Sequence, residues 1–460
     1  MRADLLASAP DGFDEAIAAV DAFDQALVAG LVRPQPAQAA GLAHLAEAVA
    51  GTPLASRVAE AAEKAAAGVA GEDHFVALAA ARTALLGAAH DALMAQIQEA
   101  TGRSASAAEA AQATGSEAAM NLLTAARSWL SDLARVGWQG LDSDVVAGSA
   151  QVLSAMLPNP SLRRLAVLLD GFAAELAASC PGAAMERFPA RRWADLWSRA
   201  LMLTIPGGLA KAATRKATGR LLPLGIDLQE HATAVQVQVH AVFEPADENT
   251  RPRLVRASVS APKPDTVIGA GLWQLLRPHL SLLSAVSEGR AMELTDMPLT
   301  DEGDLIWNDK NARRGGPADP FATARVVLPT ATDAPTAPLR RHPASIAVPV
   351  FLEGYTIDQE TLTVAGHPLA IDADRIPVAG PLTPNAIRAS GACIALLRWN
   401  DGQFRVQPLA VETTVKKKVA AVHAGAWAGG TTDKEGVKAE KAATEAIVVL
   451  VERAGRLLRK

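Results

Sequence analysis

The spacing of apolar residues changes at about residue 221, and this change constrains the fold more than any other feature. Before it, apolar side chains recur every three or four positions, for example over residues 13–31. That is the stripe of an amphipathic helix. After it, residues 234–243 alternate strictly between apolar and polar side chains, which is typical of a half-buried strand. The pattern predicts an α+β fold: an all-helical N-terminal half, built as a bundle or a repeat-like array, a mainly antiparallel β-rich half and a C-terminal amphipathic helix.

Prolines, glycines and shifts in composition divide the 460 residues into five expected segments. They are a helical bundle at 1–98, a linker of small polar residues at 99–118, a second helical segment at 119–220, a β-rich domain at 221–415 and a basic tail at 416–460. The second segment is expected to end in a short basic helix at 209–219. The tail is expected to end in a helix at 434–458.

Within the β-rich domain, one long helix is expected at 271–288, kinked at Pro278. Short strands are expected at 291–297, 304–308 and 323–328. The clearest hairpin joins 392–399 to 403–411 through Asn400, Asp401 and Gly402. Asp-Gly supplies the positive φ angles that such a tight turn requires.

The composition narrows the class of protein. The formal net charge is −5, so no global basic field attracts nucleic acid. Two cysteines, Cys180 and Cys393, are too few for a disulfide framework or a thiolate zinc site. The acidic N-terminus does not resemble a signal peptide, and no run of about 18 apolar residues occurs. We therefore expect a cytoplasmic protein without a transmembrane segment.

The sequence contains no recognisable catalytic or cofactor motif. We therefore predict no catalytic residue, no metal ligand and no cofactor. Residues 207–211 (GGLAK) lack the spacing of a phosphate-binding loop, and no HExxH or GxSxG motif is present. Cys393 lies in an apolar stretch that is typical of a core strand. The acids at 296–309 favour a turn over a metal site or an acid–base pair.

A basic region is the main candidate for an interaction surface. Two tryptophans four residues apart lie on one face of the helix at 190–204, and arginines flank them. Tryptophans at this spacing more often belong to a core than to a base-stacking platform, so nucleic acid is the less favoured partner. The candidate interaction residues are Arg191, Arg192, Trp193, Trp197, Lys211, Arg215 and Lys216.

Two segments resemble known proteins. Residues 221–240 (LLPLGIDLQEHATAVQVQVH) and 319–328 (DPFATARVVL) are similar to uncharacterised actinobacterial proteins. Those proteins are associated with neighbourhoods that contain MoxR-class AAA+ ATPases, SWIM zinc-finger proteins and von Willebrand A proteins. The chain has neither the Walker motif nor the Cys/His pattern of those neighbours, so no catalytic residue carries over. The resemblance implies an accessory or adaptor protein.

Three functions are weighed from the sequence. The favoured one is a non-catalytic scaffold or adaptor that binds protein partners, an AAA+ ATPase among them, in a bacterial multi-component system. The first alternative is an enzyme, for instance a hydrolase, with its site in the β-rich half. A deep pocket gathering His231, His240 and the acids of 296–309 would support it. The second alternative is a nucleic-acid-binding protein that uses the basic helices of 187–220.

Overall fold

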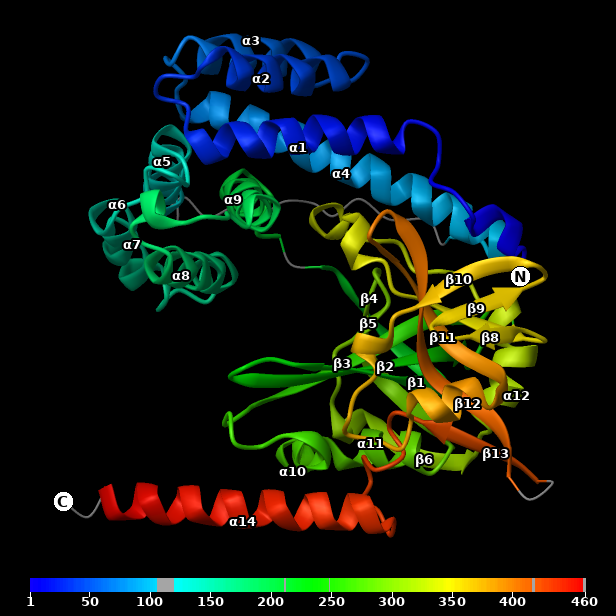
Figure 1. Cartoon of the computed structure of the whole chain (residues 1–460). Helices are drawn as coiled ribbons and strands as arrows, with labels where there is room; N and C mark the ends of the chain where they lie inside the picture. Colours follow the sequence, from blue (N-terminus) through cyan, green and yellow to red (C-terminus); the bar gives the residue numbers. More distant parts are fainter. Residues whose placement is uncertain (106–119, 211, 248, 416–417, 458–460) are drawn as a thin grey trace.

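The computed structural model describes residues 1–105, 120–210, 212–247, 249–415 and 418–457. Helices make up the N-terminal half, two sheets make up most of the C-terminal half, and a long helix, α14 (Lys434–Leu457), follows them (Figure 1). The α+β class, the helical first half and the C-terminal helix are thus confirmed, as is the mainly antiparallel character of the sheets.

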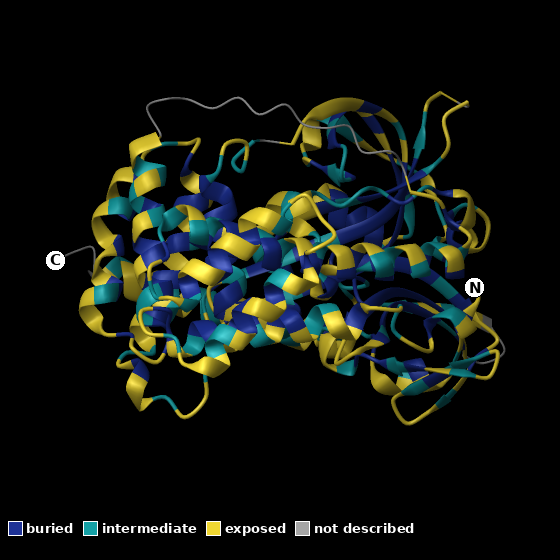
Figure 2. Cartoon of the chain, turned by 90° about the horizontal axis from the view of Figure 1, so that it is seen from above, coloured by how far each residue is buried: buried dark blue, intermediate teal, exposed yellow. Residues whose placement is uncertain are grey.

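The helical half packs around one apolar core. The first four helices each contact the next one along the chain, as short connections require. Viewed from above, exposed residues cover the outside of the molecule and buried residues lie within it (Figure 2). The helices are α1 (Phe13–Ala29), α2 (Pro36–Ala48), α3 (Ala55–Ala66), α4 (Glu72–Thr101), α5 (Met120–Val136), α6 (Ser143–Ala147), α7 (Ser149–Met156), α8 (Arg163–Ala178) and α9 (Ala190–Thr204).

Helix α4 connects the two halves of the molecule. It has 30 residues, a length of about 45 Å at the usual rise per residue. Its first half adds Phe75 and Leu78 to the helical core, and its second half adds Leu93 and Ile97 to the core of the β-rich half. Residues 99–101 of the expected linker form the last turn of α4, and residues 106–118 lie outside the described part of the chain.

The first sheet closes on itself. Its strands follow the order β1-β2-β3-β5-β4-β6, and β1 also pairs with β4, so that β1, β2, β3, β5 and β4 form a ring. Apolar side chains of these strands fill the interior. The strands are β1 (Thr214–Glu230), β2 (Ala234–Pro245), β3 (Arg253–Pro262), β4 (Arg290–Thr300), β5 (Asp304–Leu305) and β6 (Ala312–Pro317).

Strand β1 corrects one prediction. The basic helix expected at 209–219 is wrong, because Thr214–Glu230 is a continuous strand and the β-rich half begins before residue 221. Arg215 pairs with Leu299, and Ala217 pairs with Met297, both on β4. Pairing with a strand far along the sequence outweighs the local helix propensity of an alanine- and lysine-containing segment.

The second sheet contains the predicted hairpin. Its order is β7-β11-β12-β10-β9-β8, with β13 paired to β12. Asp401 and Gly402 join β11 to β12 with φ angles of 52° and 72°, as the Asp-Gly signal predicts. The strands are β7 (Val348–Glu353), β8 (Thr356–Asp358), β9 (Thr361–Val364), β10 (His367–Ile371), β11 (Ser390–Asn400), β12 (Gln403–Val415) and β13 (Lys418–His423).

Two further predictions within the β-rich half are wrong. The strand expected at 323–328 lies in a helix, α12 (Pro320–Val326), whose first turn is capped by the Asp319 side chain. The expected long helix is divided into α10 (Leu272–Leu275) and α11 (Leu280–Ser287), because Pro278 lies in the short 3₁₀ turn between them.

Candidate functional site

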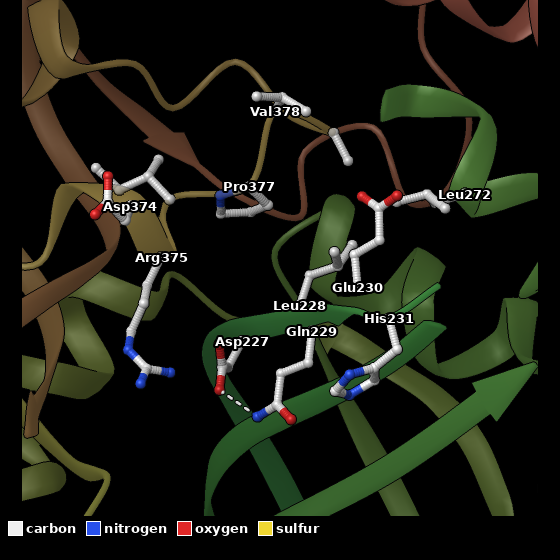
Figure 3. A pocket seen from close by; sticks show the side chains of 12 residues that line it. Asp227, Leu228, Gln229, Glu230, His231, Leu272, Asp374, Arg375, Pro377 and Val378 are labelled. Atoms are coloured by element: carbon white, nitrogen blue, oxygen red, sulfur yellow. Dashed lines mark hydrogen bonds between the residues drawn. The ribbon is translucent and has the colours of Figure 1, made fainter. Parts of the chain in front are cut away.

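A cavity of about 420 Å³, with a mixed polar and apolar lining, opens where β1 ends. One wall comes from the end of β1, and the other comes from the loop after β10, with Leu272 of α10 at one side, near Glu230 (Figure 3). The lining residues are Asp227, Leu228, Gln229, Glu230, His231, Leu272, Asp374, Arg375, Ile376, Pro377, Val378 and Ala379.

Asp227 is a buried carboxylate in the lining of this cavity. Its carboxylate accepts hydrogen bonds from Arg398 at 2.8 Å, from Gln407 at 2.9 Å and from Gln229 at 3.0 Å. Burial opposes its charge, but Arg398 and the two amide groups hold the pKa of Asp227 below its usual value. Arg398 lies on β11 and Gln407 on β12, so this charged network joins the two sheets.

His240 of β2 is buried near this network. Its Nε2 atom has no hydrogen-bond partner among the described residues. Burial lowers the pKa of His240 to about 3, the nearby Asp227 carboxylate raises it in part, and Arg256 and Arg398 lower it further. His240 is therefore held in its neutral form at physiological pH.

The pocket that would support an enzyme is not assembled as proposed from the sequence. His231 lines the cavity, but neither His240 nor any acid of 296–309 does. Asp304 instead pairs with Arg256 and, at 2.8 Å, with Arg340. Asp301, Glu302 and Gly303 form the turn between β4 and β5, which confirms the prediction of a turn.

The lining of the cavity defines its chemistry. Glu230 pairs with Lys263 at 3.2 Å, and Arg375 donates to Asp372 at 3.0 Å. Carboxylate, imidazole and guanidinium groups can bind a small polar molecule and exchange protons with it. The described residues that line the cavity include no hydroxyl, thiol or amine side chain, so they supply no such nucleophile.

The two candidate tryptophans belong to the core of the helical half. Trp193 is 1% exposed and Trp197 is 0% exposed, and the indole of Trp197 donates to the Leu130 carbonyl at 2.8 Å. Beside them, Arg191 forms an ion pair with Asp21. The proposed interaction surface is therefore wrong at both tryptophans, because their rings cannot reach a partner.

The basic residues expected around them do not form one helical surface. Arg192 pairs with Glu175. Arg215 and Lys216 lie on β1, where Lys216 pairs with Asp296 at 3.2 Å. Lys211 lies outside the described residues. The basic helices proposed for residues 187–220 thus end with α9, and the remaining charge is distributed along a strand.

A second buried network, which the sequence does not predict, lies inside the helical half. Arg82 of α4 donates to Asp24 at 2.6 and 2.8 Å, to Asp195 at 2.6 Å and to Ser198 at 3.2 Å. Burial raises the pKa of Asp24 to about 6, although Arg82 draws it downward. The Nε2 atom of His342, in the β-rich half, lies 3.4 Å from the Asp195 carboxylate. The network ties α1, α4 and α9 together.

The thiol of Cys393 takes part in neither of these two networks. Cys393 is buried, and burial raises the pKa of its thiol, so it stays protonated. Within the described ranges, no three His, Cys, Asp or Glu side chains are placed to share a metal ion. No helix in the described part of the chain combines the length and apolarity needed to cross a bilayer.

The fold and site define a class by architecture: a two-part α+β protein in which a helical half and a β-rich half share one long helix. Comparisons with models of protein families, with curated proteins and with solved structures each found no match.

Proposed function

We propose that this protein is a non-catalytic adaptor of the bacterial cytoplasm that holds a protein partner on the distal half of α14. The observation that carries this proposal is a run of six apolar residues, 446–451, in which Ile447 packs on the core of the β-rich half and Val448, Val449 and Val451 are exposed. Helices α5–α9, the β2–β3 hairpin and α14 extend toward the same side (Figure 1). Such an arrangement offers several surfaces to one partner.

The first half of α14 is held by α10 and its surroundings. Gln274 donates to the Glu440 carbonyl at 2.8 Å and to Thr444 Oγ1 at 2.9 Å, and Ala443 packs against Gly271. Beyond this contact three valines are open to solvent, whereas Ile447 and Leu450 are half-buried: Val448 is 50% exposed, Val449 45% and Val451 66%. Adjacent exposed valines at a helix end are typical of an interaction site.

The charges near the exposed valines indicate what kind of partner would bind them. Arg453 and Arg456 lie just beyond the apolar run, on the last turns of α14, and with Glu452 beside them this end of the helix carries a net positive charge. The complementary partner is a helix whose apolar face is bordered by acidic side chains. Burying a half-exposed valine contributes roughly 1 kcal/mol, so the three valines together can support a specific contact. The resemblance noted for residues 221–240 makes a MoxR-class ATPase the first partner to test.

The experiment compares the unchanged chain, a test variant and a control variant. For each form, one assay measures binding to the purified ATPase, and a second measures whether a stoichiometric partner is recovered from the host. The test variant is Val448→Asp with Val451→Asp. The matched control is Val167→Asp, at a position of α8 that is 60% exposed. We expect one partner to bind the unchanged chain and the control, and binding to fall at least tenfold in the α14 variant. A partner that binds all three forms equally would contradict the proposal.

The cavity in Figure 3 favours a second candidate function, an enzyme. Glu230 and His231 are neighbours in its lining and could exchange protons with a bound substrate. Hydrolysis of general ester and phosphodiester substrates by the unchanged chain, lost in Glu230→Gln, would favour this alternative over the adaptor. Absence of turnover in the unchanged chain would remove its support.

A further inference from the structure

A second cavity lies at the junction between the end of α4 and the β-rich half. Its volume is about 370 Å³, and it is separate from the cavity at the end of β1. Here the Asp333 amide donates to the Ser104 carbonyl at 3.0 Å, which joins the two halves. The lining residues are Gly102, Arg103, Ser104, Arg251, Pro252, Pro329, Thr330 and Ala331.

Arg103 is a buried cation that makes one side-chain hydrogen bond within the described part of the chain. Its side chain is 3% exposed, and its Nε atom donates to Asp333 at 3.0 Å. Its Nη2 atom is buried and has no partner among the described residues. A guanidinium carries five N–H donors, and a buried donor without an acceptor destabilises a folded protein.

The rest of the lining favours a negatively charged ligand. Arg251 adds a second guanidinium and has no ion pair with any described residue, and Ser104 adds an exposed hydroxyl. The described lining contains no carboxylate. Asp333 compensates one of the two positive charges, so a net positive charge remains around the cavity. Two arginines with spare donors are well suited to an oxyanion.

We propose that this junction cavity binds an oxyanion, namely the phosphate or carboxylate group of a small ligand, through Arg251 and Arg103. The ligand would contact both the end of α4 and the segment of the β-rich half that includes Thr330. Binding therefore stabilises the junction of the two halves. This proposal does not depend on the adaptor function of α14.

The test is calorimetric titration of the full chain with inorganic phosphate and, separately, with acetate, at ionic strength held constant with sodium chloride. Arg251→Gln is the test variant, because Arg251 is exposed and its loss leaves the core intact. Arg57→Gln is the matched control, on an exposed position of α3. Equal far-UV circular dichroism of the three forms confirms that each is folded.

We expect saturable binding to the unchanged chain and to Arg57→Gln, and binding about tenfold weaker in Arg251→Gln, since one charge-assisted contact is lost. Saturation by phosphate alone assigns a phosphoryl ligand, and saturation by acetate as well assigns the broader class that includes carboxylates. Failure of both anions to saturate in the millimolar range, or equal affinity in Arg251→Gln, would overturn the proposal.

Discussion

Buried Arg82 is held by carboxylates of two other helices, Asp24 and Asp195. We expect Arg82→Met to lower the free energy of unfolding by about 3–5 kcal/mol, because both acids lose a buried partner. The control, Arg191→Met, removes an ion pair with Asp21 in which both side chains are exposed. There we expect less than about 1 kcal/mol. Urea denaturation measures both values, and equal losses would show that Arg82 is not an essential partner.

The stability of the protein should depend on the ionisation of His240. Its pKa in the folded state, about 3, lies below that of an unfolded histidine. The contribution of the neutral form is therefore complete above about pH 6.5 and is lost as the pH falls toward 3. Between pH 7 and pH 5, we expect the unchanged chain to lose about 2 kcal/mol more than His240→Gln. Urea denaturation at both pH values tests this, and identical losses would contradict it.

At the scale of elements, the β11–β12 hairpin depends on the positive φ angle of Gly402. A Cβ atom at Gly402 or at Gly391 would meet no atom within 4 Å, but only Gly402 has a positive φ, 72°. Gly402→Ala should therefore cost about 1 kcal/mol through backbone strain alone. Gly391→Ala, at the other end of β11, should cost little. Thermal unfolding measures the midpoint temperature of both variants. Because neither added methyl group meets another atom, the difference between the two midpoints reports the backbone strain at Gly402.

The sequence predicts those elements whose signals are local. Strict alternation locates β2, and Asp401-Gly402 locates the hairpin, because periodicity and turn chemistry act over a few residues. The start of β1 cannot be read from local signals, because Thr214 pairs with Thr300 and Ala217 with Met297, far along the sequence. For α12, Asp319 followed by Pro320 is the local signal of an N-cap before a first-turn proline, whereas Val326 and Val327 favour a strand.

The candidate sites are less predictable than the elements. Asp227 carries one signal, a lone acid inside an apolar strand, but its partners Arg398 and Gln407 lie 171 and 180 positions away. Arg82 is likewise separated from Asp24 by 58 positions and from Asp195 by 113. Such networks depend on tertiary packing, which no local pattern encodes.

At the scale of the whole molecule, α4 should make the two halves unfold together. Ile97 belongs to the β-rich core, yet it lies on the same helix as Phe75 of the helical core. We expect Ile97→Ala to destabilise peptides of both halves by about 2–5 kcal/mol. Hydrogen exchange in urea, followed by mass spectrometry, measures each half separately. Helical peptides that keep their original protection would indicate two independent units.

The closed ring of the first sheet also has a consequence for synthesis of the chain. Strand β1 pairs with both β2 and β4, but β4 is translated only after β2, β3, α10 and α11. At elongation rates of about 5–20 residues per second, β1 leaves the ribosome several seconds before its second neighbour. During that interval the edge of β1 that later pairs with β4 is open to other nascent chains. Because of this order of translation, β1 is the strand that a chaperone would need to protect first.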